Sequence, residues 1–550
     1  MNGSRLNLLR IPVIASALAM FAASCSFVLD FSADQCESAA DCAEAFGLEG
    51  AACVDNVCVA STGEGGGGGG GVQGCVSNQQ CVDDNDQLPY MCRRKGDPCV
   101  SLLSSSCERV YGDFTDEDAV VFGFLGPFDG AFAFTGDDQI PVLELFTDEV
   151  ESFGPGLPGG PNGARRPIVI VVCDESVAGI ESTTHLIENV KVPIIVGPAF
   201  STPLLDVANL AIQNDVFMLA TAAGSPLLLD LQDEGLIWSV ETNAVANAQP
   251  YKAVLSEVET AARAAQAVPT GTDIKVAHTV SGDVVVQSTA NSVTQTIEFN
   301  GMPALDNGTN YQRFEYGDPT EGPVDLTPVV VEILNMEPNV IILQGQIEIY
   351  EQLMRPLEEN WPMGVERPFY ISEKQGPEFV QVATDHPDAI TRHRGFQFFE
   401  DKSSINYQSF AIEYRSVHPM GIDPPPFAEN VYDALYLAAY ATMAIGSVAN
   451  ENLTGTAYAK ALPLLNAPGT TINVGGDDFQ QGTNLLLSDQ DGGDFVGTTG
   501  PMEFDELLGS PRGIYEVWCM DTAFEYQHAG QFYDPTSEQL QGTFECPAPM

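Results

Sequence analysis

The sequence predicts an α/β protein with two doubly wound lobes behind a Cys-rich, disulfide-stapled stalk. From about residue 113, short apolar runs alternate with stretches of helix length: AVVFGF at 119, PIVIVV at 167, VPIIVG at 192, DVFMLA at 215, IKVAHT at 274 and NVIILQ at 339. Continuous apolar strands separated by helices are typical of parallel sheet covered on both faces. These units continue for roughly 400 residues, more than one sheet normally carries, which favours two lobes.

Two helices can be placed from periodicity. After GPAFS, one apolar stripe recurs at helical spacing: Leu204, Leu205, Ala208, Ala211 and Ile212. Ser201 and Thr202 lie where an N-cap is expected. The run NVYDALYLAAYATMAIGSV, from Asn430, is apolar nearly all round and predicts a buried helix.

The N-terminus has the layout of an export signal. A basic segment precedes an apolar run from Ile11 to Ala23, which is too short to span a bilayer comfortably. The small residues before Cys25 resemble a bacterial lipobox: Ala22, Ala23 and Ser24. We therefore expect residues 1–24 to be removed and Cys25 to carry a lipid anchor on a bacterial membrane, outside the cytoplasm. The alternative is an ordinary secretory signal with a chance cysteine.

The charge balance excludes some partners. The chain has 22 basic and 76 acidic residues, a formal net charge of −54. Such a chain repels phosphate backbones and anionic lipid surfaces, so we expect no nucleic-acid partner and membrane contact through the anchor alone. Most of these acids are expected to form a solvated surface.

The cysteines predict disulfides. There are 13, and nine of the 12 beyond Cys25 fall between residues 36 and 107, with no C-x-x-C spacing that would indicate zinc. An exported chain favours bridges. Four of them form a compact set that most simply makes two bridges: Cys36, Cys42, Cys53 and Cys58. The next cluster, from Cys75 to Cys107, is odd in number, so one member pairs with Cys173 or stays free. Cys519 and Cys546 can close a terminal loop on each other.

The predicted domain order follows from these segments. The Cys-rich module covers 25–60, and a Gly-rich linker covers 61–74, where an unbroken glycine run behaves as flexible coil. A second Cys-rich segment covers 75–112. The two-lobed domain spans 113–535, with lobe 1 at about 113–245 and 400–495, lobe 2 at about 246–399 and 496–535, and a tail at 536–550.

Motifs for catalysis, cofactors and metals are weak. The G-x-G-x-x-G at Gly154 lies among prolines that deny a helix its start, so we expect a surface loop rather than a dinucleotide site. The DQDGGD stretch at Asp489 has Gly500 where a calcium loop requires a bidentate Glu. No G-x-S-x-G, H-E-x-x-H or Walker motif occurs. We therefore expect no enzyme, catalytic residue, cofactor or metal.

Four segments together resemble the type I periplasmic binding proteins of the leucine/isoleucine/valine-binding group: VVFGFLGPFDG (120–130), PIVIVVCDES (167–176), VPIIVGPAFSTPLLDVANLAIQNDVFMLATAAGSPLL (192–228) and DFVGTTGPMEFD (494–505). The resemblance covers roughly residues 113 to 525. It implies two lobes joined by three crossovers, a small-molecule ligand in the cleft between them, hinge closure on binding, and an ABC permease or a sensor as partner.

The same resemblance implies the ligand-binding residues, and they fall where strands of an open α/β sheet end, the usual place for a ligand. On lobe 1 they are Phe128, Asp129, Phe200, Ser201, Thr202, Thr221, Ala222, Ala223 and Gly224. On lobe 2 they are Ser281, Gln344, Gln346 and Glu373. Ser201 and Thr202 would offer hydroxyls beside free helix N–H groups to an anion, and Glu373 would hold a ligand ammonium, unless the register places Lys374 there.

Departures from the family bear on the ligand. Val280 with Ser281, and Gln344, stand where the branched-chain binders place tyrosines. An amide-lined cleft favours a polar or larger ligand. The sequence thus predicts a lipid-anchored binding protein that captures an amino acid or related compound for ABC-type uptake or sensing. The alternatives are a surface interaction or signalling lipoprotein that keeps the fold without transport, and a hydrolase that uses a cleft serine and a carboxylate.

Overall fold

The computed structural model describes residues 74–546 apart from short gaps at 130–132, 154–155, 161–163, 177–178, 320–322, 419, 447–451, 467–468, 489–491 and 499. It also describes two paired strands, β1 (Ala52–Val54) and β2 (Val57–Val59), which set Cys53 opposite Cys58. The chain divides into two compact units, Met1–Val72 and Gln73–Met550. The export signal, Cys25 and the side chains of the first four stalk cysteines lie outside the described residues.

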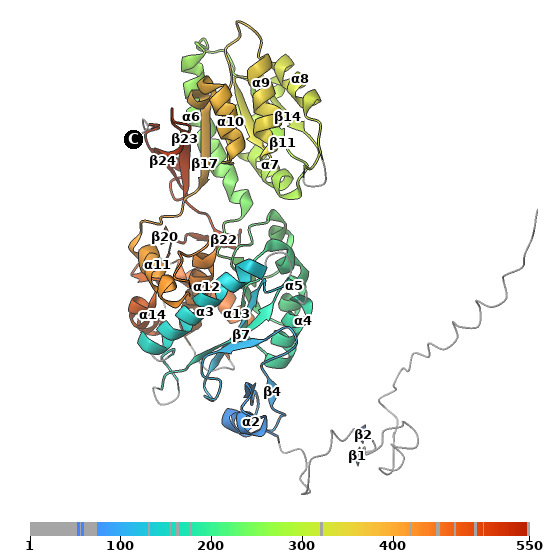
Figure 1. Cartoon of the computed structure of the whole chain (residues 1–550), viewed down its shortest axis with the longest axis vertical. Coiled ribbons are helices and arrows are strands. Elements are labelled where there is room, and N and C mark those ends of the chain that lie inside the picture. The colour runs from blue at the N-terminus through green and yellow to red at the C-terminus, as the bar shows by residue number, and fades with distance from the viewer. Residues whose placement is uncertain are drawn as a thin grey trace, which may run out of the picture. The chain divides into compact units, whose positions relative to one another are not determined.

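The first lobe is built on a six-stranded sheet in the order β10-β9-β8-β6-β7-β5 (Figure 1). Its strands are β5 (Arg109–Tyr111), β6 (Val120–Gly126), β7 (Ile168–Asp174), β8 (Ile194–Val196), β9 (Phe217–Ala220) and β10 (Ile237–Ser239). All pairs are parallel except β5 with β7. Every residue of β6 is buried, as the apolar run at 119 predicts.

Alternate residues of these strands enter two separate cores. Phe122 and Phe124 of β6 face one core with α3 (Ala133–Phe153), α11 (Ile405–Val417), α12 (Ala428–Ala444) and α14 (Gly476–Ser488). Val121 and Leu125 face the other, with η3 (His185–Val190), which continues α4 (Gly179–Thr184), and with α5 (Ser201–Gln213). Because a strand alternates its side chains, both faces of the sheet are covered.

The second lobe contains an eight-stranded sheet in the order β14-β11-β15-β16-β17-β23-β24-β25. The strands are β11 (Val276–Val280), β14 (Tyr311–Glu315), β15 (Val340–Gln344), β16 (Phe369–Ser372), β17 (His393–Phe398), β23 (Tyr515–Met520), β24 (Tyr526–Asp534) and β25 (Gln539–Gly542). The part from β14 to β17 is parallel, and the last three strands are antiparallel.

Helices cover both faces of this sheet as well. One core includes α8 (Thr327–Met336), η7 (Ile349–Met354), α9 (Arg355–Asn360) and α10 (Pro377–Asp385). The other includes α6 (Ala248–Ala265) and α7 (Val284–Thr296). The shorter elements of the two lobes are η4 (Pro226–Asp230), η5 (Ala244–Asn247), β12 (Glu298–Phe299), β13 (Met302–Pro303), η6 (Ala304–Asn310), η8 (Pro387–Arg392), α13 (Gly455–Ala461), η10 (Leu462–Leu465), β18 (Thr471–Asn473), β19 (Asp494–Gly497), β20 (Gly500–Pro501), β21 (Phe504–Asp505) and β22 (Ser510–Pro511).

The chain crosses between the lobes three times: after β10, after β17 and before β23. Two boundaries differ from the sequence prediction. Residues 496–511 belong with lobe 1, because β19 pairs with β18 and the Ser239 amide donates to the Gly509 carbonyl next to β22. The predicted tail from 536 includes β25, which pairs with β24. The sequence could not show this, since β25 is polar and gains its place from backbone pairing alone.

The second Cys-rich segment is joined to lobe 1 rather than separate from it. It contains α2 (Asn78–Asp84), β3 (Tyr90–Met91) and β4 (Val100–Ser101), with disulfides Cys75–Cys92 and Cys81–Cys99. Its fifth cysteine, Cys107, bonds to Cys173 of β7, which resolves the odd count. Sulfurs of three cysteines lie within 4.8 Å of one another, but they are held in disulfides and are not metal ligands. The predicted Cys519–Cys546 bridge is confirmed.

The two predicted helices are present. The run from Asn430 forms α12, in which every residue except Asn430 and Ala444 is buried. The stripe after GPAFS forms α5, but its N-cap is Phe200, and Ser201 and Thr202 are its first helical residues, so the capping prediction was wrong by one position. None of the helices among the described residues is both long and apolar enough to cross a membrane.

Gly395→Ala is expected to lower the free energy of unfolding by about 2 kcal/mol, because a methyl group has no space there. Gly395 of β17 pairs with Trp518 of β23, and an ideal Cβ would lie 1.9 Å from Trp518 Cε2. Urea unfolding measures the change. Gly179→Ala is the control, since nothing lies within 4 Å of its Cβ position. Equal stability of the two variants would contradict this packing.

Candidate functional site

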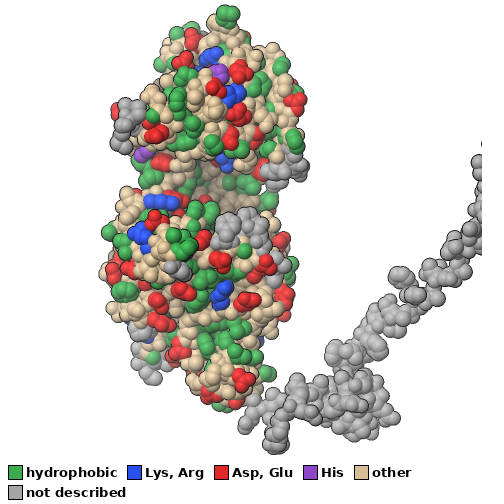
Figure 2. All heavy atoms as spheres, viewed as in Figure 1, with side chains coloured by type: hydrophobic (Ala, Val, Ile, Leu, Met, Phe, Trp, Pro, Cys, Tyr) green, Lys and Arg blue, Asp and Glu red, His purple; other side chains and the backbone are tan. Residues whose placement is uncertain are grey.

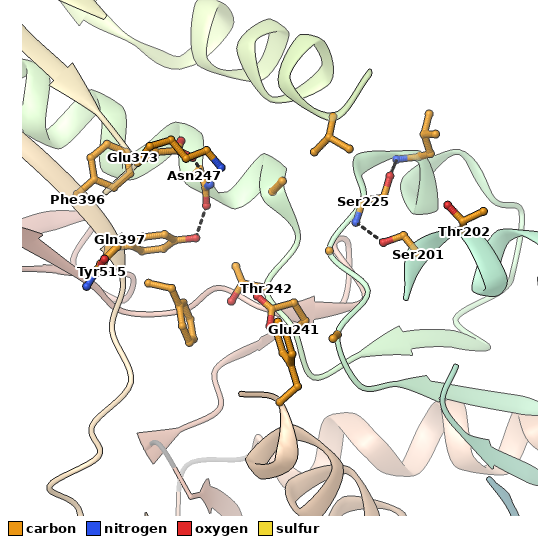
Figure 3. Close-up of a pocket in the computed structure, with 18 of the residues that line it drawn as sticks. Ser201, Thr202, Ser225, Glu241, Thr242, Asn247, Glu373, Phe396, Gln397 and Tyr515 are labelled. Atoms are coloured by element: carbon orange, nitrogen blue, oxygen red, sulfur yellow. Dashed lines mark hydrogen bonds between the residues drawn. The ribbon is translucent and has the colours of Figure 1, made fainter. Parts of the chain in front are cut away.

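A cavity of about 680 Å³ is lined by residues of both lobes (Figure 3). The lobe 1 wall is formed by the segments that follow β9 and β10 and by the first turn of α5. The lobe 2 wall is formed by residues at the carboxyl ends of β16 and β17 and at the start of β23. Figure 3 shows Glu373, Asn247 and Tyr515 on one side, Ser201 and Thr202 on the other, and Glu241 with Thr242 between them. This is where open α/β sheets place their ligands.

The lobe 1 wall is small and polar. Ser201 and Thr202 occupy the first turn of α5, and Ala222 and Gly224 leave the loop after β9 open to the cavity. The Ser201 hydroxyl accepts a hydrogen bond from the Ser225 amide at 3.2 Å. It is held in place by this bond, and its own proton is free to point at a ligand.

The first crossover contributes two further groups. Glu241 and Thr242 follow β10 and line the cavity. Thr242 is 7% exposed, and its Oγ1 has no hydrogen-bond partner among the described residues. A buried hydroxyl left without a partner is costly, so such an atom at a cavity wall indicates a group that a ligand completes.

The lobe 2 wall centres on Glu373, directly after β16. Its Oε2 accepts from Asn247 Nδ2 at 3.2 Å, and the Tyr515 hydroxyl donates to Asn247 Oδ1. Its Oε1 is buried, and the Tyr251 hydroxyl also donates to this carboxyl, which opposes the rise in the pKa of Glu373 that burial causes. The first crossover therefore fixes one carboxylate oxygen of Glu373 at the cavity wall. Phe396 and Phe398 of β17 add aromatic surface beside it.

Two carboxyl groups of the cavity have altered acidity. Burial raises the pKa of Glu241 to about 7; the Asn430 amide opposes the shift, and the carboxylates of Glu400 and Glu429 add to it. Burial also raises the pKa of Glu373, opposed by the charge of Lys374. Desolvation disfavours an isolated charge, and both carboxyls would ionise more readily beside a cation.

Five of the thirteen predicted residues line this cavity: Ser201, Thr202, Ala222, Gly224 and Glu373. The other lobe 1 residues do not. Phe128 and Asp129 line a separate groove with Arg109 and Asp174, and Phe200 lines an apolar pocket beside the cavity. Thr221 and Ala223 are 1% exposed, because alternate residues after β9 turn into the interior.

The remaining lobe 2 predictions also miss the cavity. Ser281 is 0% exposed. Gln344 is buried with its Oε1 2.6 Å from His278 Nε2, and burial lowers the pKa of His278 to about 4, which keeps this histidine neutral. Gln346 is not among the lining residues of the cavity, and its backbone N–H donates to Glu348 Oε1. The predicted amide-lined cleft was therefore wrong: the Gln344 side chain completes the interior.

The lining residues that the sequence did not reveal come mainly from the crossovers and from the strands beside them: Glu241, Thr242, Asn247, Phe396, Gln397, Phe398 and Tyr515. The sequence did contain a signal for Glu241 and Thr242: the segment VETN directly follows the apolar run LIWS. In the same way GPFDG and TAAGS each follow an apolar run. No signal marked Tyr515, because it enters the sheet only when the chain returns after residue 513.

Comparison with known proteins supports this architecture. No protein-family model matches the sequence, and the search of curated proteins found no relative. A crystal structure from Rhodospirillum rubrum, assigned to branched-chain amino acid ABC transport, matches with a TM-score of 0.51 and 17% identity over 74% of this chain and 99% of that one. The chain therefore has the fold of the type I periplasmic binding proteins.

Weaker structural matches include two complexes. One is a solute-binding protein from Rhodopseudomonas palustris with 3,4-dihydroxybenzoic acid, at TM-score 0.44 and 15% identity over 78% of this chain and 98% of that one. The other is LivJ from Streptococcus pneumoniae with isoleucine, at TM-score 0.43 and 17% identity over 73% of this chain and 96% of that one.

Proposed function

We propose that the chain is an extracytoplasmic solute-binding protein that captures a small polar ligand, an amino acid or related compound, between its lobes for ABC-type uptake or sensing. The observation that carries the proposal is the cavity of about 680 Å³, whose wall contains the Glu373 carboxyl and one buried hydroxyl, Thr242 Oγ1, that lacks a hydrogen-bond partner within the described chain. Such cavities with a few convergent polar groups are the usual ligand sites.

The fold and sequence support the rest of this proposal. The Rhodospirillum rubrum structure that shares the fold is assigned to ABC transport. Three crossovers border the cavity, so a ligand that contacts both lobes would favour one arrangement of them over another. The lipobox-like sequence before Cys25 would hold the protein at a membrane. The Cys-rich and Gly-rich segments would give the binding domain reach.

Thermal unfolding of the full chain tests the proposal. The screen would contain amino acids, amides, short peptides and sugars. A ligand at about 100 times its Kd is expected to add about 2.7 kcal/mol of stability, and so to raise the Tm. A selective shift would support solute binding. A flat response across the screen would contradict it and favour a surface interaction protein.

Thr242→Val is expected to weaken binding of any ligand found in that screen about 10-fold, since a hydrogen bond is worth about 1 to 1.5 kcal/mol. The unliganded protein should unfold at the same urea concentration as wild type or a higher one, because the hydroxyl has no partner to lose. Thr260→Val, on the exposed face of α6, is the matched control. Unchanged affinity in Thr242→Val would exclude this hydroxyl from the site.

A further inference from the structure

Glu241 is a carboxyl in the cavity wall that the chain itself leaves without a cation. Its Oε2 accepts from Asn430 Nδ2 at 3.2 Å, and no ion pair to it occurs among the described residues. The charged groups that act on it are two further carboxylates, Glu400 and Glu429. Lys402 lies 3.0 Å from Glu400 and 3.9 Å from Glu429, so its charge is engaged by these two carboxylates.

Glu373 provides a second carboxyl in the same cavity. Its carboxyl accepts hydrogen bonds from Asn247 and Tyr251, and no ion pair to it occurs among the described residues. The phenol of Tyr515 lies in the electrostatic field of both carboxyls, since each of them raises its pKa. The two acids therefore border one space, and Lys374 is the only basic residue in its lining.

A cavity with this lining has an excess of negative charge. Buried carboxylates are stable only when they are paired or hydrogen-bonded, and neither Glu241 nor Glu373 has an ion pair among the described residues. The aromatic ring of Phe398, which is partly exposed, also lines the cavity and favours a cationic ligand group. Acidic side chains elsewhere lie scattered over the molecular surface (Figure 2), whereas these two line the cavity.

We propose that Glu241 and Glu373 together select a ligand with two positively charged nitrogen groups, a diamine or a diamino acid. This inference rests on the proposed function of the cleft and names the ligand class. Glu373 binds one cationic group from the lobe 2 side, and Glu241 binds the other from the first crossover. A volume of about 680 Å³ accommodates an extended ligand with charges at both ends.

Calorimetric titration of the full chain with four matched probes tests this. Ornithine and 1,4-diaminobutane each carry two ammonium groups, and norvaline and 1-aminobutane are their counterparts with one. Each dication is expected to bind at least about 10-fold more tightly than its counterpart, as charged hydrogen bonds are worth about 1.5 to 3 kcal/mol. Preference for ornithine over 1,4-diaminobutane would assign a diamino acid, and the reverse a diamine.

The variant Glu241→Gln should lose about 10- to 100-fold in affinity for the dications and stay within about 2-fold for norvaline and 1-aminobutane. Gln keeps the size of the side chain and its acceptor for Asn430, and a thermal melt checks folding. Glu400→Gln is the matched control: it is a neighbouring carboxyl outside the cavity lining, and we expect at most about a 3-fold loss from its weaker field.

The failures of the two proposals are distinguishable. Equal binding of dications and their counterparts, or unchanged dication affinity in Glu241→Gln, would overturn the cation inference. The cation inference would also be overturned if none of the four probes binds but another compound of the wider screen stabilises the chain. In that case the solute-binding function stands. No stabilisation by any compound would overturn both.

Discussion

Replacing Cys107 and Cys173 together with alanine is expected to lower the free energy of unfolding of lobe 1 by about 4 kcal/mol. The bridge closes a loop between residues 66 positions apart and ties the segment before β5 to the buried strand β7. A cross-link of this span restricts the unfolded chain by about 4 kcal/mol in the loop-entropy model. Both cysteines are at most 1% exposed, so the cavity left by two sulfurs adds to the loss.

Urea unfolding followed by the fluorescence of Trp238, in β10, reports on lobe 1. The single variant Cys107→Ala is expected to lose most of the stability that the double variant loses, because either change removes the cross-link. The Cys519→Ala, Cys546→Ala pair in lobe 2 is the comparison and should leave the Trp238 transition in place. An unchanged Trp238 transition in the Cys107, Cys173 double variant would contradict a stabilising role for this bridge.

Glu175→Gln is expected to stabilise the protein at pH 8 by about 2 to 4 kcal/mol and to leave it unchanged near pH 4.5. Glu175 is 3% exposed, and burial raises its pKa from 4.5 to about 8. Between those pH values the unfolded state releases the proton and the folded state keeps it. Native stability therefore falls by up to about 1.4 kcal/mol per pH unit as pH rises.

Glutamine removes this pH-dependent loss without removing the contact. The Ala199 amide donates to Glu175 Oε2 at 2.6 Å, and a glutamine oxygen can accept the same bond, which supports the chain just before Ser201. Denaturation at pH 4.5, 6 and 8 measures the effect. Glu144→Gln, an exposed carboxyl on α3, should change stability by less than about 0.5 kcal/mol at every pH. Parallel pH profiles for wild type and Glu175→Gln would contradict a buried, protonated Glu175.

The candidate site could be predicted from sequence only where the chain marks a strand end locally. Ser201, Ala222 and Gly224 follow buried apolar runs directly, and all three line the cavity. Ser281 follows an apolar run and Gln344 ends one. Successive side chains of a strand point to opposite faces, so a shift of one position turns a side chain away from the cavity. In the structure these two face the interior and bond within it.

The sequence by itself determined the class of the fold, the presence of two lobes and the positions of α5 and α12, because hydrophobic periodicity is a local signal that one stretch of chain carries alone. It also left one cysteine of the odd cluster either paired with Cys173 or free. Only the tertiary structure decided that Cys107 makes that bond, that β25 extends the lobe 2 sheet, and that Glu241 and Tyr515 border the cavity. These features depend on segments brought together from distant parts of the chain. Residues 241, 373 and 515 border one cavity because the fold brings three distant segments together. No local sequence pattern predicts which of these segments meet.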